Sequence, residues 1–219
     1  MPPSEREIEV LGWFEAIRRR PEMYVGGRGH SALLWLLGAL LETPLHPSLV
    51  TVTLDGTAIT IDAESVAPSV TAREPTGASF LVDVATRISA PLDQPPTLAG
   101  VEDLWIEDGR AEFIMTTQAP TALAIANALG ESLTLTSRQP PTATSFSFVR
   151  GSVVDGPTTT PTNGPPGMSI LFAPDDQIFR WSFRFEAVAE VVRDFSCRRG
   201  VDVRVKNRES GATYARSAG

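Results

Sequence analysis

The chain has 219 residues and a mass of 23.6 kDa, which suits one large domain or two small ones. Hydrophobic residues make up 42% of it and charged residues 21%, as in an ordinary globular protein. Its net charge of −7 and its isoelectric point near 4.9 argue against a nonspecific DNA-binding protein, which needs a basic surface to displace counterions. We therefore expect no direct contact with nucleic acid.

The chain carries no sequence signal for secretion or for a membrane. Its single cysteine, Cys197, excludes an internal disulfide framework and fits a reducing compartment. Segment 4–9 is too highly charged for a signal peptide, and the apolar segment 32–41 is about half as long as a membrane span. These features predict a cytoplasmic protein without a membrane partner.

The first part of the chain predicts helices and a strand hairpin. Apolar residues recur at helical spacing over 4–19, and residues 31–42 are apolar nearly all round, which is typical of a buried helix. Strict alternation over 50–54 and 59–62 indicates two strands. In chain order we expect a helix over 4–19 ended by Pro21, a helix over 31–42, strands over 50–54 and 59–62 joined at Asp55-Gly56, and a helix over 78–88.

The second part predicts mostly strands, with two more helices. In chain order we expect a weakly structured connection over 90–107, a strand over 110–116, a helix over 120–129 stopped by Gly130, strands over 132–137 and 143–150, an exposed loop over 156–167, a strand over 168–172, a helix over 183–197, a strand over 201–206 and a frayed tail from 209. The mixture indicates an α+β domain.

Four arginines lie close together near the start of the chain, namely Arg18, Arg19, Arg20 and Arg28. They suit the C-terminus of a helix, where positive charge is favourable, and they could equally form a local basic patch. The sequence leaves both interpretations open.

Residues 14–26, FEAIRRRPEMYVG, resemble the (L/F)-E-A-(V/I)-R-x-R-P-x-M-Y-(I/V)-G motif of the ATPase domain in the gyrase B and topoisomerase IV B family. Weaker similarities follow in the family's order, in the strand pair 50–62, in Ala126-Asn127-Ala128-Leu129, in 167–175 (GMSILFAPD) and in 193–205. The resemblance implies the GHKL (Bergerat) fold, a two-layer α/β sandwich whose mixed, mostly antiparallel sheet has helices on one face. It implies a single domain over 1–208, followed by the frayed tail 209–219.

The resemblance also places the family's chemistry on residues that cannot perform it. The glutamate that activates water falls at Trp35, and the asparagine that binds magnesium falls at Ala39. Hydrolysis of a phosphoanhydride needs both a general base and a divalent ion. We therefore expect no catalytic residue and no metal ligand, and the lone histidines His30 and His46 provide no alternative metal site.

The other nucleotide-binding positions are altered as well. Asp62, or Glu64 in a shifted register, is either a remnant of the adenine-binding D-x-G-x-G motif or a simple strand-end acid, because the glycines are absent. Pro120 falls where a glycine-rich lid would present N–H groups to phosphate, and it has no N–H. Met168 replaces a threonine. Trp35, Ala39, Asp62, Pro120 and Met168 thus outline a vestigial nucleotide pocket.

These observations predict a catalytically inactive homologue that acts as a binding or regulatory module, with a protein partner or with itself. The alternative is a nucleotide-binding protein related to the ATPase subunits of type II topoisomerases. We expect no cofactor, and ATP and magnesium are implied by the family resemblance alone.

Overall fold

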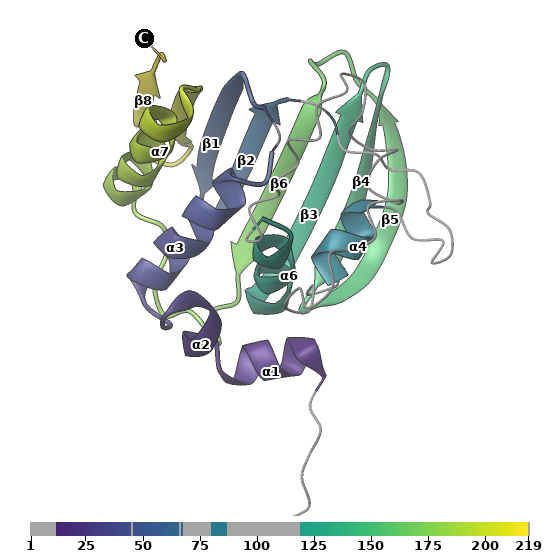
Figure 1. Cartoon of the computed structure of the whole chain (residues 1–219), viewed down its shortest axis with the longest axis vertical. Coiled ribbons are helices and arrows are strands. Elements are labelled where there is room, and N and C mark those ends of the chain that lie inside the picture. The colour runs from purple at the N-terminus through teal and green to yellow at the C-terminus, as the bar shows by residue number, and fades with distance from the viewer. Residues whose placement is uncertain (1–11, 45, 66, 68–79, 87–118, 219) are drawn as a thin grey trace, which may run out of the picture.

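A computed structural model describes residues 12–44, 46–65, 67, 80–86 and 119–218 of the chain. Figure 1 shows the helices gathered on one face of a single twisted sheet, with α1 below its lower end. The expected connection 90–107 and the strand expected over 110–116 lie outside the described residues.

The described helices and strands alternate along the chain as an α+β fold. The helices are α1 (Trp13–Arg19), α2 (Glu22–Val25), α3 (His30–Leu41), α4 (Phe80–Thr86), α6 (Ala119–Leu129) and α7 (Phe185–Arg199). The strands are β1 (Leu49–Asp55), β2 (Ala58–Glu64), β3 (Gly130–Gln139), β4 (Thr142–Val149), β5 (Ser152–Pro161), β6 (Gly167–Pro174), β7 (Asp202–Asn207) and β8 (Thr213–Arg216).

The eight strands form one mixed sheet in the order β5-β4-β3-β6-β2-β1-β7-β8. β1 and β7 are parallel, and the other six neighbouring pairs are antiparallel. The mostly antiparallel sheet with helices on one face confirms the predicted two-layer architecture.

Strand alternation divides the sheet into a covered face and an open face. Val50, Val52 and Leu54 of β1 are buried, whereas Thr51 and Thr53 between them are partly exposed. Successive side chains of a strand point to opposite sides, so the first set lies under the helices and the second faces away from them. The hairpin predicted at Asp55-Gly56 is confirmed, with Asp55 paired to Ala58.

Helix α3 supplies much of the core but is not buried all round. Leu33, Leu36, Leu37 and Leu40 are fully buried, and burying one such side chain stabilises the fold by about 1.5–3 kcal/mol. Trp35 is 46% exposed, so the expectation of complete burial is wrong on that side. One side of the helix packs toward the sheet, and an apolar sequence does not reveal which side is left uncovered.

The first helix is shorter than its apolar spacing indicated. Gly12 has an extended backbone and precedes α1, so the helix begins at Trp13, and residues before Gly12 lie outside the description. Its end was predicted correctly, because α1 stops at Arg19, just before Pro21.

The segment 156–167 is the expected exposed loop only over 162–166. Residues up to Pro161 belong to the edge strand β5, whose residues are all exposed and which pairs with β4. Proline is compatible with an edge strand because one side of the strand makes no ladder hydrogen bonds. The glycine, proline and threonine content indicated a loop over 156–161, but these residues form a strand because they pair with β4.

The tail expected to fray from 209 also forms a strand. β8 pairs antiparallel with β7, and Val205 lies opposite Tyr214. Chain reversal is aided by Asn207, whose Oδ1 accepts hydrogen bonds from the N–H groups of Glu209 and Ser210.

The remaining predicted elements agree with the structure to within a few residues. α7 ends at Arg199 and is followed by Gly200, whose positive φ of 65° suits a helix C-terminus; the helix begins two residues later than expected, at Phe185. In α4, Leu81 and Ala85 are buried. No helix in the described ranges has both the length and the apolar character needed to cross a membrane.

Gly130 follows the last residue of α6, and a side chain is excluded there by close contacts rather than by a positive φ. A Cβ atom at this position would lie 2.8 Å from the carbonyl oxygen of Ala126 and 2.9 Å from Cε2 of Phe172. The close approach lets the chain pass directly from α6 into β3.

Substituting Gly130 with alanine should lower the free energy of unfolding by about 1–3 kcal/mol, because the added methyl group overpacks the α6–β3 junction. Urea denaturation measures the change. Gly164→Ala is the matched control, since its Cβ would meet nothing closer than Thr162 Oγ1 at 3.6 Å. Equal stability of the two variants would contradict this account.

Substituting Leu37 with aspartate should cost more than about 3 kcal/mol, because an unpaired charge would be placed in the core of α3. Ser31→Asp places the same charge at an exposed position of the same helix and should change stability by less than about 0.5 kcal/mol. A soluble Leu37→Asp protein with an unchanged melting temperature would show that α3 is not a core helix.

Candidate functional site

The predicted positions of the catalytic base and the magnesium ligand both lie on α3. Trp35 and Ala39 are four residues apart and therefore share one side of the helix. The Trp35 side chain is 46% exposed, and Ala39 is partly buried at the edge of the core. An indole and a methyl group neither accept a proton from water nor bind a divalent ion.

Asp62 and Met168 lie on neighbouring strands but on opposite faces of the sheet. Met168 of β6 is opposite Ala63 of β2, and both are buried on the covered face. Asp62 is opposite Ser169, one position along, and therefore faces the open side. The predicted adenine acceptor thus lies on the other side of the sheet from α3.

The Asp62 carboxylate already has a cationic partner. Arg138 of β3 forms an ion pair with it at 2.7 Å and donates from Nη2 to the carbonyl oxygen of Ala63 at 3.0 Å. The arginine reaches β2 across Gly167 of β6, where a Cβ would lie 2.0 Å from that carbonyl oxygen. This glycine therefore permits a contact that spans three strands.

The five predicted positions are not assembled into one site. Trp35, Ala39 and Met168 belong to the covered side of the sheet, and Asp62 belongs to the open side. Pro120 is the second residue of α6, as the sequence predicted, but its side chain lies outside the description. In the part of the chain that the structure describes, no three histidine, cysteine, aspartate or glutamate side chains are grouped as metal ligands.

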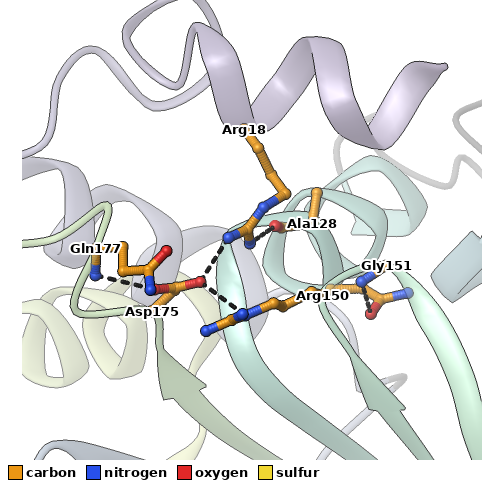
Figure 2. A network of polar contacts seen from close by, with 7 residues as sticks. Arg18, Ala128, Arg150, Gly151, Asp175 and Gln177 are labelled. Carbon is orange, nitrogen blue, oxygen red and sulfur yellow. Dashed lines mark hydrogen bonds and ion pairs between the residues drawn. The ribbon is translucent and has the colours of Figure 1, made fainter. Parts of the chain in front are cut away.

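The strongest polar cluster lies elsewhere, around the buried carboxylate of Asp175 (Figure 2). Arg18 of α1 donates from Nη2 to Asp175 Oδ2 at 2.5 Å and from Nη1 to the carbonyl oxygen of Ala128 at 2.8 Å. Arg150, in the turn between β4 and β5, places Nε 3.2 Å from the same Oδ2. The N–H of Gln177 donates to Oδ1 at 2.9 Å.

A second buried side chain fixes the β4–β5 turn beside this cluster. Asn127 of α6 is 1% exposed, accepts a hydrogen bond from the N–H of Gly151 at 3.1 Å, and donates to the carbonyl oxygen of Ala85 at 2.8 Å. It joins α4, α6 and the turn that carries Arg150. An amide group in this position satisfies backbone groups that would otherwise be buried without partners.

The charges around Asp175 determine its ionisation. Burial acts to raise the pKa of this carboxyl group, but the hydrogen bonds from Arg18 and the Gln177 N–H and the charges of Arg18 and Arg150 outweigh it. The pKa is therefore lowered below its ordinary value, and Asp175 is ionised at neutral pH.

A cleft of about 540 Å³ opens beside the cluster. Phe14 and Ile178 contribute apolar surface. The charged lining residues are Glu15, Arg18, Arg19, Arg28 and Arg150. We call this feature the arginine cleft.

Comparison with known proteins identifies a shared fold. No protein-family model matches the chain, and no curated protein matches it. Among solved structures, the 43K ATPase domain of Thermus thermophilus gyrase B in complex with an aminocoumarin superposes with a TM-score of 0.72 over 92% of this chain, at 18% sequence identity. The chain has the fold of the gyrase B ATPase domain. It spans about half, 50%, of that gyrase B chain.

The gyrase B-like fold confirms the sequence resemblance at the level of structure. The segments that carried the resemblance also meet in space, since Arg18, Asn127 and Asp175 come from three separate similar blocks. The Asp175 cluster thus draws on segments that resemble the family's motifs, whereas Trp35, Ala39 and Asp62 lie elsewhere.

Sequence reasoning did not find the Asp175 cluster. Asp175 was noted only as the end of a strand motif, and Arg150 belongs to no motif. A signal was available in an aspartate directly after the apolar run of β6 and its proline, because a carboxylate at the end of a buried strand requires a cationic partner. The identity of that partner follows only from the fold.

Substituting Asp175 with asparagine should lower the free energy of unfolding by about 3 kcal/mol at pH 7, because two arginines lose their anion. The lowered pKa means that the carboxylate stabilises the fold above the ordinary aspartate range, near about 3.9, and that this stabilisation is lost as pH falls through the folded value. The difference between the two proteins should therefore shrink below about pH 4.

Urea denaturation across this pH range measures the effect. Asp55→Asn is the control, because its ion pair with Arg208 is exposed on both sides and should contribute less than about 1 kcal/mol. A difference between wild type and Asp175→Asn that stays constant from neutral to acid pH would contradict the role of the charge.

Proposed function

We propose that this chain is a binding or regulatory module that uses the gyrase B ATPase fold without hydrolysing ATP. One observation carries the proposal. Trp35 and Ala39 lie on α3 over the covered face of the sheet, whereas Asp62 lies on the open face in an ion pair with Arg138. The separation of the expected base and metal positions from the expected adenine position supports a module without ATPase activity.

The chemistry of each position supports the same conclusion. Replacing a general base by tryptophan removes proton abstraction, which typically contributes about 10²–10⁴-fold to the rate. Loss of the magnesium ligand removes the charge neutralisation on which phosphoryl transfer relies. Pro120, at the start of α6, has no N–H to offer a phosphate. These losses affect separate steps of the reaction.

A role in binding is supported by the exposure of tryptophan. Each tryptophan within the described residues is exposed: Trp13 by 61%, Trp35 by 46% and Trp181 by 62%. Tryptophan is usually well buried in a monomer and is enriched at the centres of protein interfaces. The proposed partner is therefore another protein or a second copy of this chain.

The wild-type protein should release no phosphate from Mg-ATP above a mock-purified control, because base, metal ligand and lid are altered together. The 43K domain of Thermus thermophilus gyrase B, assayed in parallel, is the comparison protein. The double variant Trp35→Glu, Ala39→Asn should also be inactive, since Pro120 and the position of Asp62 are unchanged. Saturable phosphate release by the wild type would overturn the proposal.

Direct titration distinguishes the alternative of a nucleotide-binding protein. Magnesium-dependent binding of ATP that weakens on substitution of Trp35 would favour that alternative, and ADP and GTP report its base and phosphate preference. Sedimentation velocity over a range of protein concentrations tests self-association. Trp181→Ser and Trp35→Ser each remove one exposed indole. Comparing the two variants shows which tryptophan lies on the surface that mediates self-association.

A further inference from the structure

Arg150 is held in place by its backbone before any ligand is considered. Its φ is +48°, in the left-handed region that non-glycine residues rarely adopt. The next residue, Gly151, has φ +95°, and a Cβ there would lie 2.7 Å from Cγ of Phe14. With the N–H of Gly151 bonded to Asn127, the turn is fixed on both sides. Strained residues held in this manner cluster at functional sites.

The side chain of Arg150 is held by Asp175 through one of its three guanidinium nitrogens. Its Nε lies 3.2 Å from Asp175 Oδ2, and its side chain is 45% exposed and lines the arginine cleft. The two terminal nitrogens make no hydrogen bond to any residue in the described part of the chain. A guanidinium group with both terminal nitrogens available matches the paired oxygens of a carboxylate or a phosphate.

The arginines of the cleft carry more positive charge than the neighbouring carboxylates of the described residues balance. Arg18 and Arg150 share the single carboxylate of Asp175. Arg19 has its own partner in Glu15 at 2.7 Å, and the ion pair of Arg28 with Glu22 is long, at 3.8 Å. Among the described residues, Arg18 and Arg150 thus place two positive charges beside one carboxylate, on a chain whose net charge is −7. A local excess of positive charge on an acidic protein attracts anions to one place.

The size and surface of the cleft suit a small molecule. Its volume of about 540 Å³ lies within the usual range for small-molecule sites. Phe14 and Ile178 give it apolar surface beside the arginines, so a ligand with both an anionic group and a less polar body could be accommodated.

We propose that the arginine cleft binds a small oxyanion-bearing ligand, with Arg150 as its principal anchor and Arg28 as a second contact. The site is separate from the nucleotide positions on α3 and β2, and the proposal therefore goes beyond the proposed function. Phosphate and carboxylate share the required chemistry, and the experiment distinguishes them.

Isothermal titration of the full chain with pyrophosphate and, separately, with citrate tests the proposal at fixed ionic strength. We expect saturable binding that weakens as sodium chloride is raised. Arg150→Gln should weaken it by at least about tenfold, the loss expected for hydrogen bonds to a charged group. Stronger binding of pyrophosphate would identify phosphate as the preferred group, and stronger binding of citrate would identify carboxylate.

Two further variants keep the test decisive. Arg193→Gln removes an arginine of equal exposure from α7, away from the cleft, and should bind as the wild type does. Arg28→Gln lies outside the Asp175 cluster and should fold normally while weakening binding, so it serves if Arg150→Gln fails to fold. No binding by the wild type, or equal weakening in the Arg193→Gln protein, would overturn the proposal.

ATP separates this proposal from the previous one. Any ATP held through its phosphates in the arginine cleft should be lost in Arg150→Gln, should not require magnesium and should not be hydrolysed. ATP binding that persists in Arg150→Gln and depends on magnesium would instead favour the nucleotide-binding alternative, and the pyrophosphate titration would still test the arginine cleft independently.

Discussion

The buried carboxylate of Asp175 is the interaction on which the lower end of the fold depends. It lies just beyond β6 and binds an arginine from α1 and another from the β4–β5 turn, while its own backbone N–H donates to Leu129 at the end of α6. Segments more than a hundred residues apart are thereby joined at one charge. A buried charge is stable only when it is paired. Detachment of α1 would remove Arg18 from the buried Asp175 carboxylate and would therefore destabilise the fold.

This constraint explains which parts of the sequence resemble the gyrase B family. Arg18 belongs to the block that matches best and Asn127 to a weaker one, and both join α6 to its neighbours. Trp35 and Ala39 lie away from the fully buried side of α3, with Trp35 exposed and Ala39 partly buried against the core. The residues that join the elements of this fold and the positions that depart from the family's motifs therefore lie in different parts of the structure.

The sequence was sufficient for most of the architecture but not for the site. Alternation in β1 and β2 is a local property, and it predicted both the strands and the face that each residue occupies. β5 was missed because its pairing with β4 is not encoded in its own glycine, proline and threonine content. The ion pair of Asp62 with Arg138 depends on the register of three strands, and no local pattern carries that information.

The free edge of the sheet at β5 limits the ways in which this chain can meet another protein. An edge strand usually offers its main chain to a neighbouring strand, and a flat apolar edge invites uncontrolled stacking. β5 has Pro157 and Pro161 among its ten residues, and neither can donate a main-chain hydrogen bond. An incoming strand would therefore find gaps in the ladder. At the β5 edge, contact with another protein would therefore depend on side chains rather than on backbone pairing.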